Sequence, residues 1–130
     1  MTQLRRFTDD AGWQDAAGYS RAVRRGNLIM VSGTTAHGPD GAALHPGDTA
    51  GQARACLARI ERALIALGGA MSDVVRTGIY LSPGANWEEA ARAHHAVFAD
   101  IRPASTMLYV AELVGDGFLV EIEAQAVVAS

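Results

Sequence analysis

Glu121 has the setting in this sequence that best suits acid–base chemistry. It lies in the segment 119–128, where polar and apolar residues alternate. Alternation with a period of two is typical of a strand, so Glu121 and Glu123 should project from the same face of a sheet. A partly desolvated carboxylate has a raised pKa and can take a proton from water. We therefore expect Glu121 to be catalytic, with a structural carboxylate inside an oligomer as the alternative.

Hydroxyl groups that could orient a small ligand occur at Tyr19, Ser32 and Ser105. Ser32 lies in the sequence Val31-Ser32-Gly33, which lacks the G-x-S-x-G pattern of a hydrolase nucleophile. We expect Ser32 to hydrogen-bond a ligand rather than to attack one. A purely structural role, in a strand or in an interface, is the alternative for each of the three hydroxyl groups.

The sequence offers no pattern that would hold a metal ion or a common cofactor, and we expect neither. All 11 basic residues are arginine, which excludes Schiff-base chemistry on a lysine and lysine-anchored pyridoxal phosphate. His94 and His95 are adjacent, and neighbouring helical residues point about 100° apart, so they cannot easily share one ion. Metal-binding motifs of the HxH, HExxH and CxxC types and glycine-rich phosphate loops do not occur.

The length and composition fit one folded domain that spans residues 1–130. Hydrophobic residues make up 49% of the chain and charged residues 19%. A net charge of −3 gives no electrostatic reason to expect a nucleic-acid partner. The single cysteine fits a reducing compartment. Neither a signal peptide nor the roughly 20 apolar residues that span a bilayer can be found, so we expect a cytoplasmic protein without a membrane segment.

Two helical segments are predicted between strands. The first begins at Thr49, which has capping-box spacing with Gln52, and ends before Gly68-Gly69. Its apolar residues recur every three or four positions and include Cys56, which we therefore expect in the core. The second helix begins after an N-cap at Asn86, with Trp87 and Val97 among its inner residues, and ends before Pro103. The expected strands span residues 4–7, 19–24, 28–34, 74–81, 105–113 and 118–128.

These elements follow one another in the order β-β-β-α-β-α-β-β. Amphipathic helices bury their apolar stripe on a sheet, so both helices should cover one face of a mixed sheet in an α+β architecture. No segment of the chain remains to cover the second face, which carries apolar residues beside Glu121 and Glu123. An exposed face of this kind favours packing against other copies of the chain.

Several segments together resemble the RidA/YjgF (Rid) superfamily. Segment 25–34 is similar to the family's glycine turn and the strand after it, and segment 73–81 is similar to its central strand. Segments 102–106 and 119–124 are similar to its C-terminal signature. The matches occur in the family's order over nearly the whole chain. The resemblance implies a chorismate-mutase-like fold and a homotrimer with ligand clefts between neighbouring subunits.

The resemblance also implies an activity and a set of site residues. Well-studied Rid proteins hydrolyse small enamines and imines to ammonia and a keto acid. Tyr19, Ser32 and Glu121 match the family's tyrosine, serine and glutamate, and Gly33 matches its backbone donors. In that arrangement Glu121 lies near the attacking water.

The sequence departs from the family where the substrate is clamped. An arginine two residues after the proline binds the substrate carboxylate in the family, and Ser105 stands at this position. Met107 stands where deaminating members often have cysteine, and Ala91 where an asparagine is common. Ordinary imino acids should therefore be weak substrates, with Ser105 and Met107 as substrate-binding residues for a different ligand.

Three functions are considered on these grounds. The first is hydrolysis of a small enamine, imine or related metabolite, with Glu121 activating water. The second is non-catalytic binding of a neutral or aromatic metabolite, which Tyr19 and Met107 would suit. The third is the ribonuclease activity attached to some relatives. It is disfavoured by the acidic balance and by the lack of a basic, aromatic surface.

Overall fold

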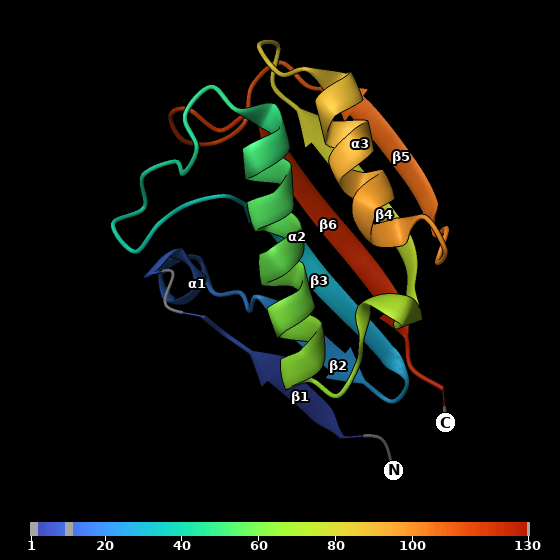
Figure 1. Cartoon of the computed structure of the whole chain (residues 1–130). Coiled ribbons are helices and arrows are strands. Elements are labelled where there is room, and N and C mark those ends of the chain that lie inside the picture. The colour runs from blue at the N-terminus through green and yellow to red at the C-terminus, as the bar shows by residue number, and fades with distance from the viewer. Residues whose placement is uncertain (1–2, 10–11, 130) are drawn as a thin grey trace.

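Six strands form one sheet in the computed structural model, which describes residues 3–9 and 12–129 (Figure 1). The strands are β1 (Leu4–Phe7), β2 (Ala22–Arg25), β3 (Leu28–Thr35), β4 (Val74–Leu81), β5 (Ala104–Tyr109) and β6 (Val120–Val127). The helices are α1 (Gly12–Ala17), α2 (Thr49–Ala66), the 3-10 turn η1 (Met71–Asp73) and α3 (Trp87–Phe98).

The last strand lies in the middle of the sheet, whose order is β1-β2-β3-β6-β4-β5. β6 is antiparallel to both β3 and β4, so these two strands run parallel to each other, while β4 and β5 pair in parallel. Parallel strands need a crossover connection, and α2 and α3 are those connections. Both helices cover the same face of the sheet, which is the predicted α+β, chorismate-mutase-like architecture (Figure 1).

The core lies between this helix pair and the sheet. The alternation predicted for the last strand is confirmed, since every second residue of β6 is buried from Val120 to Ala126. Cys56 is confirmed as a core residue on the inner stripe of α2. Burial raises the pKa of its thiol to about 12, so it stays protonated at neutral pH. The turn predicted at Gly26 is a two-residue hairpin loop in which Gly26 has a φ of +59°.

Some elements differ from the sequence prediction. The helix α1 and the turn η1 were not predicted, because six and three residues are too few to show a helical period. β2 begins at Ala22 rather than at Tyr19. β5 ends at Tyr109, and residues 110–119 form a loop that contains Asp116 and Gly117.

The capping box predicted for α2 is wrong. The N-cap is Asp48, whose carboxylate accepts a hydrogen bond from a backbone N–H of the first turn at 2.9 Å. Thr49 instead accepts a hydrogen bond from the backbone N–H at the N-cap of α3. Gln52 is fully buried, where its amide bonds the backbone carbonyl of Gly117 and the N–H of Leu119. Gln52 therefore holds the loop before β6 rather than the end of its own helix.

The start of α3 is as predicted, but part of its inner face is not. Asn86 is the N-cap and accepts from the backbone N–H of Glu89. Trp87 and Val97 were expected to face the core, yet 53% and 36% of their surfaces are exposed. The helix lies over β4 and the edge strand β5, and its buried residues are Ala90, Ala93 and Phe98.

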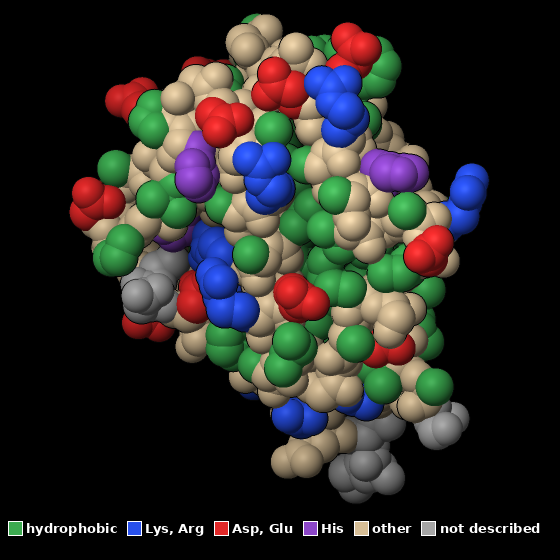
Figure 2. Space-filling model, viewed as in Figure 1, with side chains coloured by type: hydrophobic (Ala, Val, Ile, Leu, Met, Phe, Trp, Pro, Cys, Tyr) green, Lys and Arg blue, Asp and Glu red, His purple; other side chains and the backbone are tan. Residues whose placement is uncertain are grey.

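The two faces of the sheet differ in what they expose. Charged side chains of both signs are scattered over the helix-covered face (Figure 2). On the opposite face, which none of the described helices covers, alternate strand residues project outward and leave apolar side chains 42–48% exposed. These are Leu28, Met30, Leu108 and Val127. No helix in the described part of the chain has the length and apolar character needed to cross a membrane.

The N-cap assignment can be tested by removing one carboxylate. Asp48→Ala leaves a backbone N–H of α2 without its partner and should lower the free energy of unfolding by about 1 kcal/mol. Urea denaturation followed by circular dichroism measures this loss. Asp100→Ala removes an exposed carboxylate beyond the end of α3 and should change stability little. Equal losses in the two variants would contradict the assignment.

Candidate functional site

Glu121 lies on the open face of the sheet, directly above a glycine. Its neighbours Val120 and Ile122 are buried in the core, so the strand alternation turns the carboxylate the other way. A Cβ atom placed on Gly33 of β3 would overlap the Oε2 atom of Glu121. The absence of a side chain at Gly33 therefore leaves the space that the carboxylate occupies.

A β-bulge places Gly33 under this carboxylate. The register between β3 and β6 shifts between Val31 and Thr34, so Ser32 and Gly33 leave the regular ladder. The hydroxyl of Ser32 donates to the backbone carbonyl of Ser20 at 2.7 Å. Because this bond uses its only proton, Ser32 can accept a hydrogen bond from a ligand but has none to donate.

Burial raises the pKa of Glu121, and the nearby charge of Glu123 acts in the same direction, whereas the positive charge of Arg21 opposes the shift. The carboxylate borders an open hollow of about 320 Å³. Glu123 and Tyr80 also line this hollow, together with residues 110 and 112–114 of the loop after β5. A half-buried carboxylate beside open space can exchange a proton with water or with a ligand.

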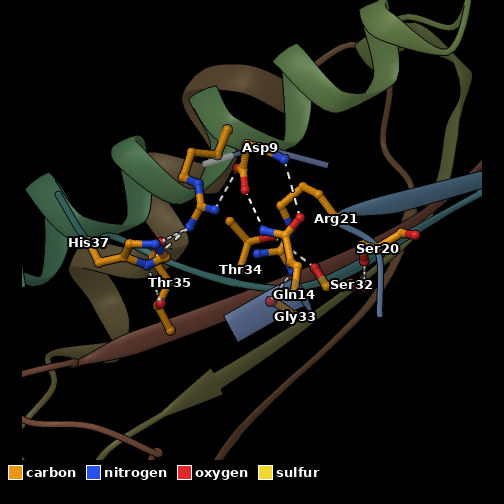
Figure 3. Close-up of polar contacts among 10 residues, drawn as sticks. Asp9, Gln14, Ser20, Arg21, Ser32, Gly33, Thr34, Thr35 and His37 are labelled. Carbon is orange, nitrogen blue, oxygen red and sulfur yellow. Dashed lines mark hydrogen bonds and ion pairs between the residues drawn. The ribbon is translucent and has the colours of Figure 1, made fainter. Parts of the chain in front are cut away.

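Arg21 is a site residue that the sequence analysis missed. Its side chain is 97% buried, and its Nη2 atom donates to the carbonyl oxygen of Gly33 at 2.6 Å (Figure 3). Its guanidinium carbon lies 5.9 Å from the centre of the Tyr19 ring. An arginine in a loop before a strand is normally exposed, so no sequence pattern indicates this burial.

The short helix α1 positions Tyr19. The backbone N–H groups of Gly18 and Tyr19 both donate to the carbonyl of Gln14, which ends the helix. Gly18 adopts a φ of +79°, a conformation that glycine reaches without strain. Tyr19 leaves this turn with 41% of its surface exposed, so its ring remains open to a ligand or to a second chain.

A second buried arginine, Arg59 of α2, binds the N-terminal segment that contains Asp9 to this helix. Arg59 forms an ion pair with Asp9 at 2.6 Å and also donates to the carbonyl of Thr35 at 2.7 Å (Figure 3). Gln14 donates to the same aspartate. Burial alone would raise the pKa of Asp9, but the hydrogen bonds from Arg59 and Gln14 and the charges of Arg59 and Arg21 outweigh it, and the pKa is lowered.

Ser105 and Met107 lie on the other face of the sheet from Glu121. Ser105 pairs with Thr77 of β4, and Met107 pairs with Ile79. Thr77 and Ile79 are buried beneath the helices, whereas Tyr80, the partner of Glu121, belongs to the open face. Within one chain, Glu121 lies against Gly33, next to Ser32 in sequence, and Tyr19 lies beside Arg21, which bonds Gly33. Ser105 and Met107 lie on the other face of the sheet.

Ser105 ends a chain of hydrogen bonds that begins in α3. The hydroxyl of Thr77 donates to Ser105 at 2.8 Å and lies 2.9 Å from Nε2 of His94. Burial lowers the pKa of His94, so the imidazole is neutral at neutral pH. Arg102, which follows α3, is exposed and has a φ of +56°. Position 105 is thus bordered by uncharged hydrogen-bonding groups.

Metal ligation has no candidate in the described ranges 3–9 and 12–129. No group of three or more histidine, cysteine, aspartate or glutamate side chains is arranged there to hold an ion. His94 and His95 lie on neighbouring positions of α3, where His94 bonds Thr77 and His95 points to solvent.

Comparison with known proteins assigns the chain to a family. The family model described as Endoribonuclease L-PSP matches residues 12–128, nearly the whole chain. An uncharacterised protein of Streptomyces coelicolor is 29% identical over 123 residues, which cover 95% of this chain and 91% of that protein. The 3-aminoacrylate deaminase RutC of Acinetobacter baylyi is 31% identical over 110 residues, covering 85% of this chain and 86% of the deaminase.

A solved structure supports the same assignment. Rv2704 of Mycobacterium tuberculosis, described as a member of the YjgF/YER057c/UK114 family, is 41% identical and superposes with a TM-score of 0.87. The superposition covers 97% of this chain and 100% of the mycobacterial one. With the matching family model and the shared fold, these findings show that the chain belongs to the RidA/YjgF family.

Proposed function

We propose that this protein hydrolyses a small enamine, imine or related metabolite in clefts between the subunits of a homotrimer, with Glu121 activating the water. The observation that carries the proposal is the position of the Glu121 carboxylate, half-buried over Gly33 and open to a hollow. The relative from Acinetobacter baylyi is named as a deaminase of 3-aminoacrylate, which is an enamine.

In the proposed reaction, Glu121 takes a proton from water while the water oxygen bonds to the carbon of the C=N group. The electron pair of the C=N bond moves to nitrogen, which becomes an amine. The protonated Glu121 returns its proton to this nitrogen, which gives a neutral carbinolamine. Glu121 then takes the proton of the carbinolamine hydroxyl group and passes it to the nitrogen as the C=O bond forms and the C–N bond breaks, so that ammonia and a carbonyl compound are released. A carboxylate whose pKa is raised by burial suits both steps, since it is a stronger base than an exposed one.

The surroundings of Ser105 restrict the substrate. Ser105 carries no charge, and the groups bonded in sequence behind it, Thr77 and a neutral His94, carry none either. None of these three side chains is a cation that could replace the hydration of a substrate carboxylate. The proposed substrate therefore presents a neutral group to Ser105 and an apolar part to Met107.

The trimer is proposed for two reasons. Glu121 lies on the face of the sheet opposite to Ser105, so one cleft can hold both side chains only if two chains contribute to it. The open face also carries apolar side chains that are partly exposed in the isolated chain, including Met30 and Leu108. Packing copies face to face removes this apolar surface from water.

Non-catalytic binding of a small metabolite in the same clefts is the alternative. Cleavage of RNA, the activity in the description of the family model, is not proposed. The hollow beside Glu121 is also lined by Glu112 and Glu123, and carboxylates repel the phosphate backbone.

Replacing Glu121 by glutamine distinguishes the proposed hydrolysis from non-catalytic binding. Glu121→Gln should lower the rate of hydrolysis by about 100-fold or more, because an amide cannot take a proton from water. The measurement is keto-product release from 2-iminopropanoate and from a carboxylate-free imine of similar size, of which the second should react faster. Glu123→Gln removes the neighbouring carboxylate on the same face and should keep most of the activity.

If the wild-type protein and Glu121→Gln bind the two imines equally well and neither hydrolyses them, the binding alternative would be favoured. Hydrolysis of 2-iminopropanoate at the rate of arginine-bearing relatives would contradict the proposed role of Ser105.

Relative to the wild-type protein, Glu121→Gln should be more stable at neutral pH than it is at pH 4. Because burial raises the pKa of Glu121 above its usual 4.5, ionisation costs more in the folded chain than in the unfolded chain. The contribution of Glu121 to stability is therefore present below pH 4.5 and is lost as the pH rises through the raised pKa. The excess stability of Glu121→Gln, measured by urea denaturation, should shrink as the pH falls from 7 to 4. An excess that grows instead would show the opposite pKa shift.

The proposed assembly predicts a particle with three times the mass of the chain. Sedimentation equilibrium should give this mass for the wild-type protein. Met30→Glu places a charge on the apolar open face and should yield monomers, because burying an unpaired carboxylate is costly. Ile65→Glu changes an exposed residue on the outer side of α2 and should remain trimeric. A monomeric wild-type protein would rule out clefts between subunits.

A further inference from the structure

Arg21 is buried in a way that its contacts with neutral groups do not explain. Only 3% of its surface is exposed, and the one hydrogen bond of its side chain in the described part of the chain goes to the carbonyl of Gly33. Its Nε atom is buried without a hydrogen-bond partner. A buried guanidinium stays protonated in proteins, so its charge must be offset by a nearby negative group.

Glu121 and Asp9 are the negative groups whose charges act on Arg21. Asp9 already forms an ion pair with Arg59 at 2.6 Å. Glu121 forms no ion pair within 4.0 Å among the described residues, and it lies over the same Gly33 whose carbonyl Arg21 holds. Arg21 and Glu121 therefore both adjoin Gly33, Arg21 at its carbonyl oxygen and Glu121 at the place of a missing side chain, and the charge of each shifts the pKa of the other.

We propose that Arg21 is the positioning residue of the Glu121 site: its guanidinium fixes the Gly33 peptide beneath the carboxylate and holds Glu121 in its ionised, proton-accepting form. The inference rests on the proposed role of Glu121 as the group that takes a proton from water. It assigns the positive charge in this part of the molecule to the catalytic carboxylate rather than to a substrate.

A direct contact between Arg21 and a substrate does not fit its surroundings. The side chain is enclosed by the Gly33 backbone and the Tyr19 ring, and its Nε atom has no access to solvent. Arg21 thus acts through Glu121. Besides Arg21, three titratable groups interact electrostatically with Glu121. They are Glu123 of β6, Tyr80 of β4 and Cys56 of α2. Arg21 is the cation of this set.

The test is a titration of Glu121 itself. Glutamate labelled with ¹³C at the side-chain carboxyl reports each midpoint by NMR, and the Glu121 signal is the one absent from Glu121→Gln. Arg21→Gln keeps a donor for the Gly33 carbonyl but removes the charge, so the midpoint of Glu121 should rise by about one pH unit or more. Arg21→Lys keeps the charge and should move the midpoint less than half as far.

Arg24→Gln is the matched control. Arg24 lies three residues further on, in β2, and also donates to backbone carbonyls, but its partners are Gly26 and Leu67, away from Glu121. Its removal should leave the midpoint where it is. A folded Arg21→Gln protein with an unmoved midpoint would overturn the inference, as would an equal shift in Arg24→Gln.

A second measurement serves if Arg21→Gln does not fold. In the wild-type protein, the ¹⁵N signal of the Arg21 Nε–H group should shift at the midpoint of Glu121, and this step should vanish in Glu121→Gln. A wild-type signal without the step would refute the coupling. Neither measurement requires turnover, so a failed coupling in an active enzyme removes only the role of Arg21. An inactive protein that shows the coupling removes only the proposed function.

Discussion

The contact between the Glu121 carboxylate and the bare backbone of Gly33 determines how the rest of the site is arranged. A carboxylate can lie this close to a neighbouring strand only where the strand carries no side chain, and the bulge in β3 brings a glycine to that point. Burial against the backbone raises the pKa of Glu121. One steric condition thus sets both the place and the basicity of the proposed catalytic group.

The N-terminal segment offsets part of the energetic cost of burying the Glu121 carboxylate. A partly buried carboxylate is destabilising unless charge or hydrogen bonds offset it, and Arg21 supplies positive charge through the Gly33 peptide. Arg21 lies next to a segment that Asp9 and Arg59 fasten to α2. The short helix α1 is part of the same arrangement, because its last turn delivers Tyr19 to the site. The N-terminal segment, although it is far from Glu121 in sequence, therefore contributes to the centre of the site.

The sheet separates the candidate ligand contacts into two groups. Glu121 and its neighbours face the side without helices, whereas Ser105 faces α3 through Thr77 and His94. This separation is a direct result of strand pleating, since adjacent residues alternate between the faces. It is also the reason that Glu121 and Ser105 can line one cleft only where two copies of the chain contribute to it. With neutral hydrogen-bonding groups at Ser105, such a cleft should prefer a different substrate from a cleft in which an arginine binds the substrate carboxylate.

The sequence by itself determined the strand alternation around Glu121, the two long helices and the family, because these depend on local periodicity and on ordered motifs spread along the chain. It did not reveal the Asp48 cap or the burial of Arg21, since both depend on which distant backbone groups need a partner. Only the tertiary structure decided that Glu121 lies over Gly33 and away from Ser105. The bulge and the strand order, with β6 between β3 and β4, arise from packing between segments far apart in sequence, which no local pattern encodes.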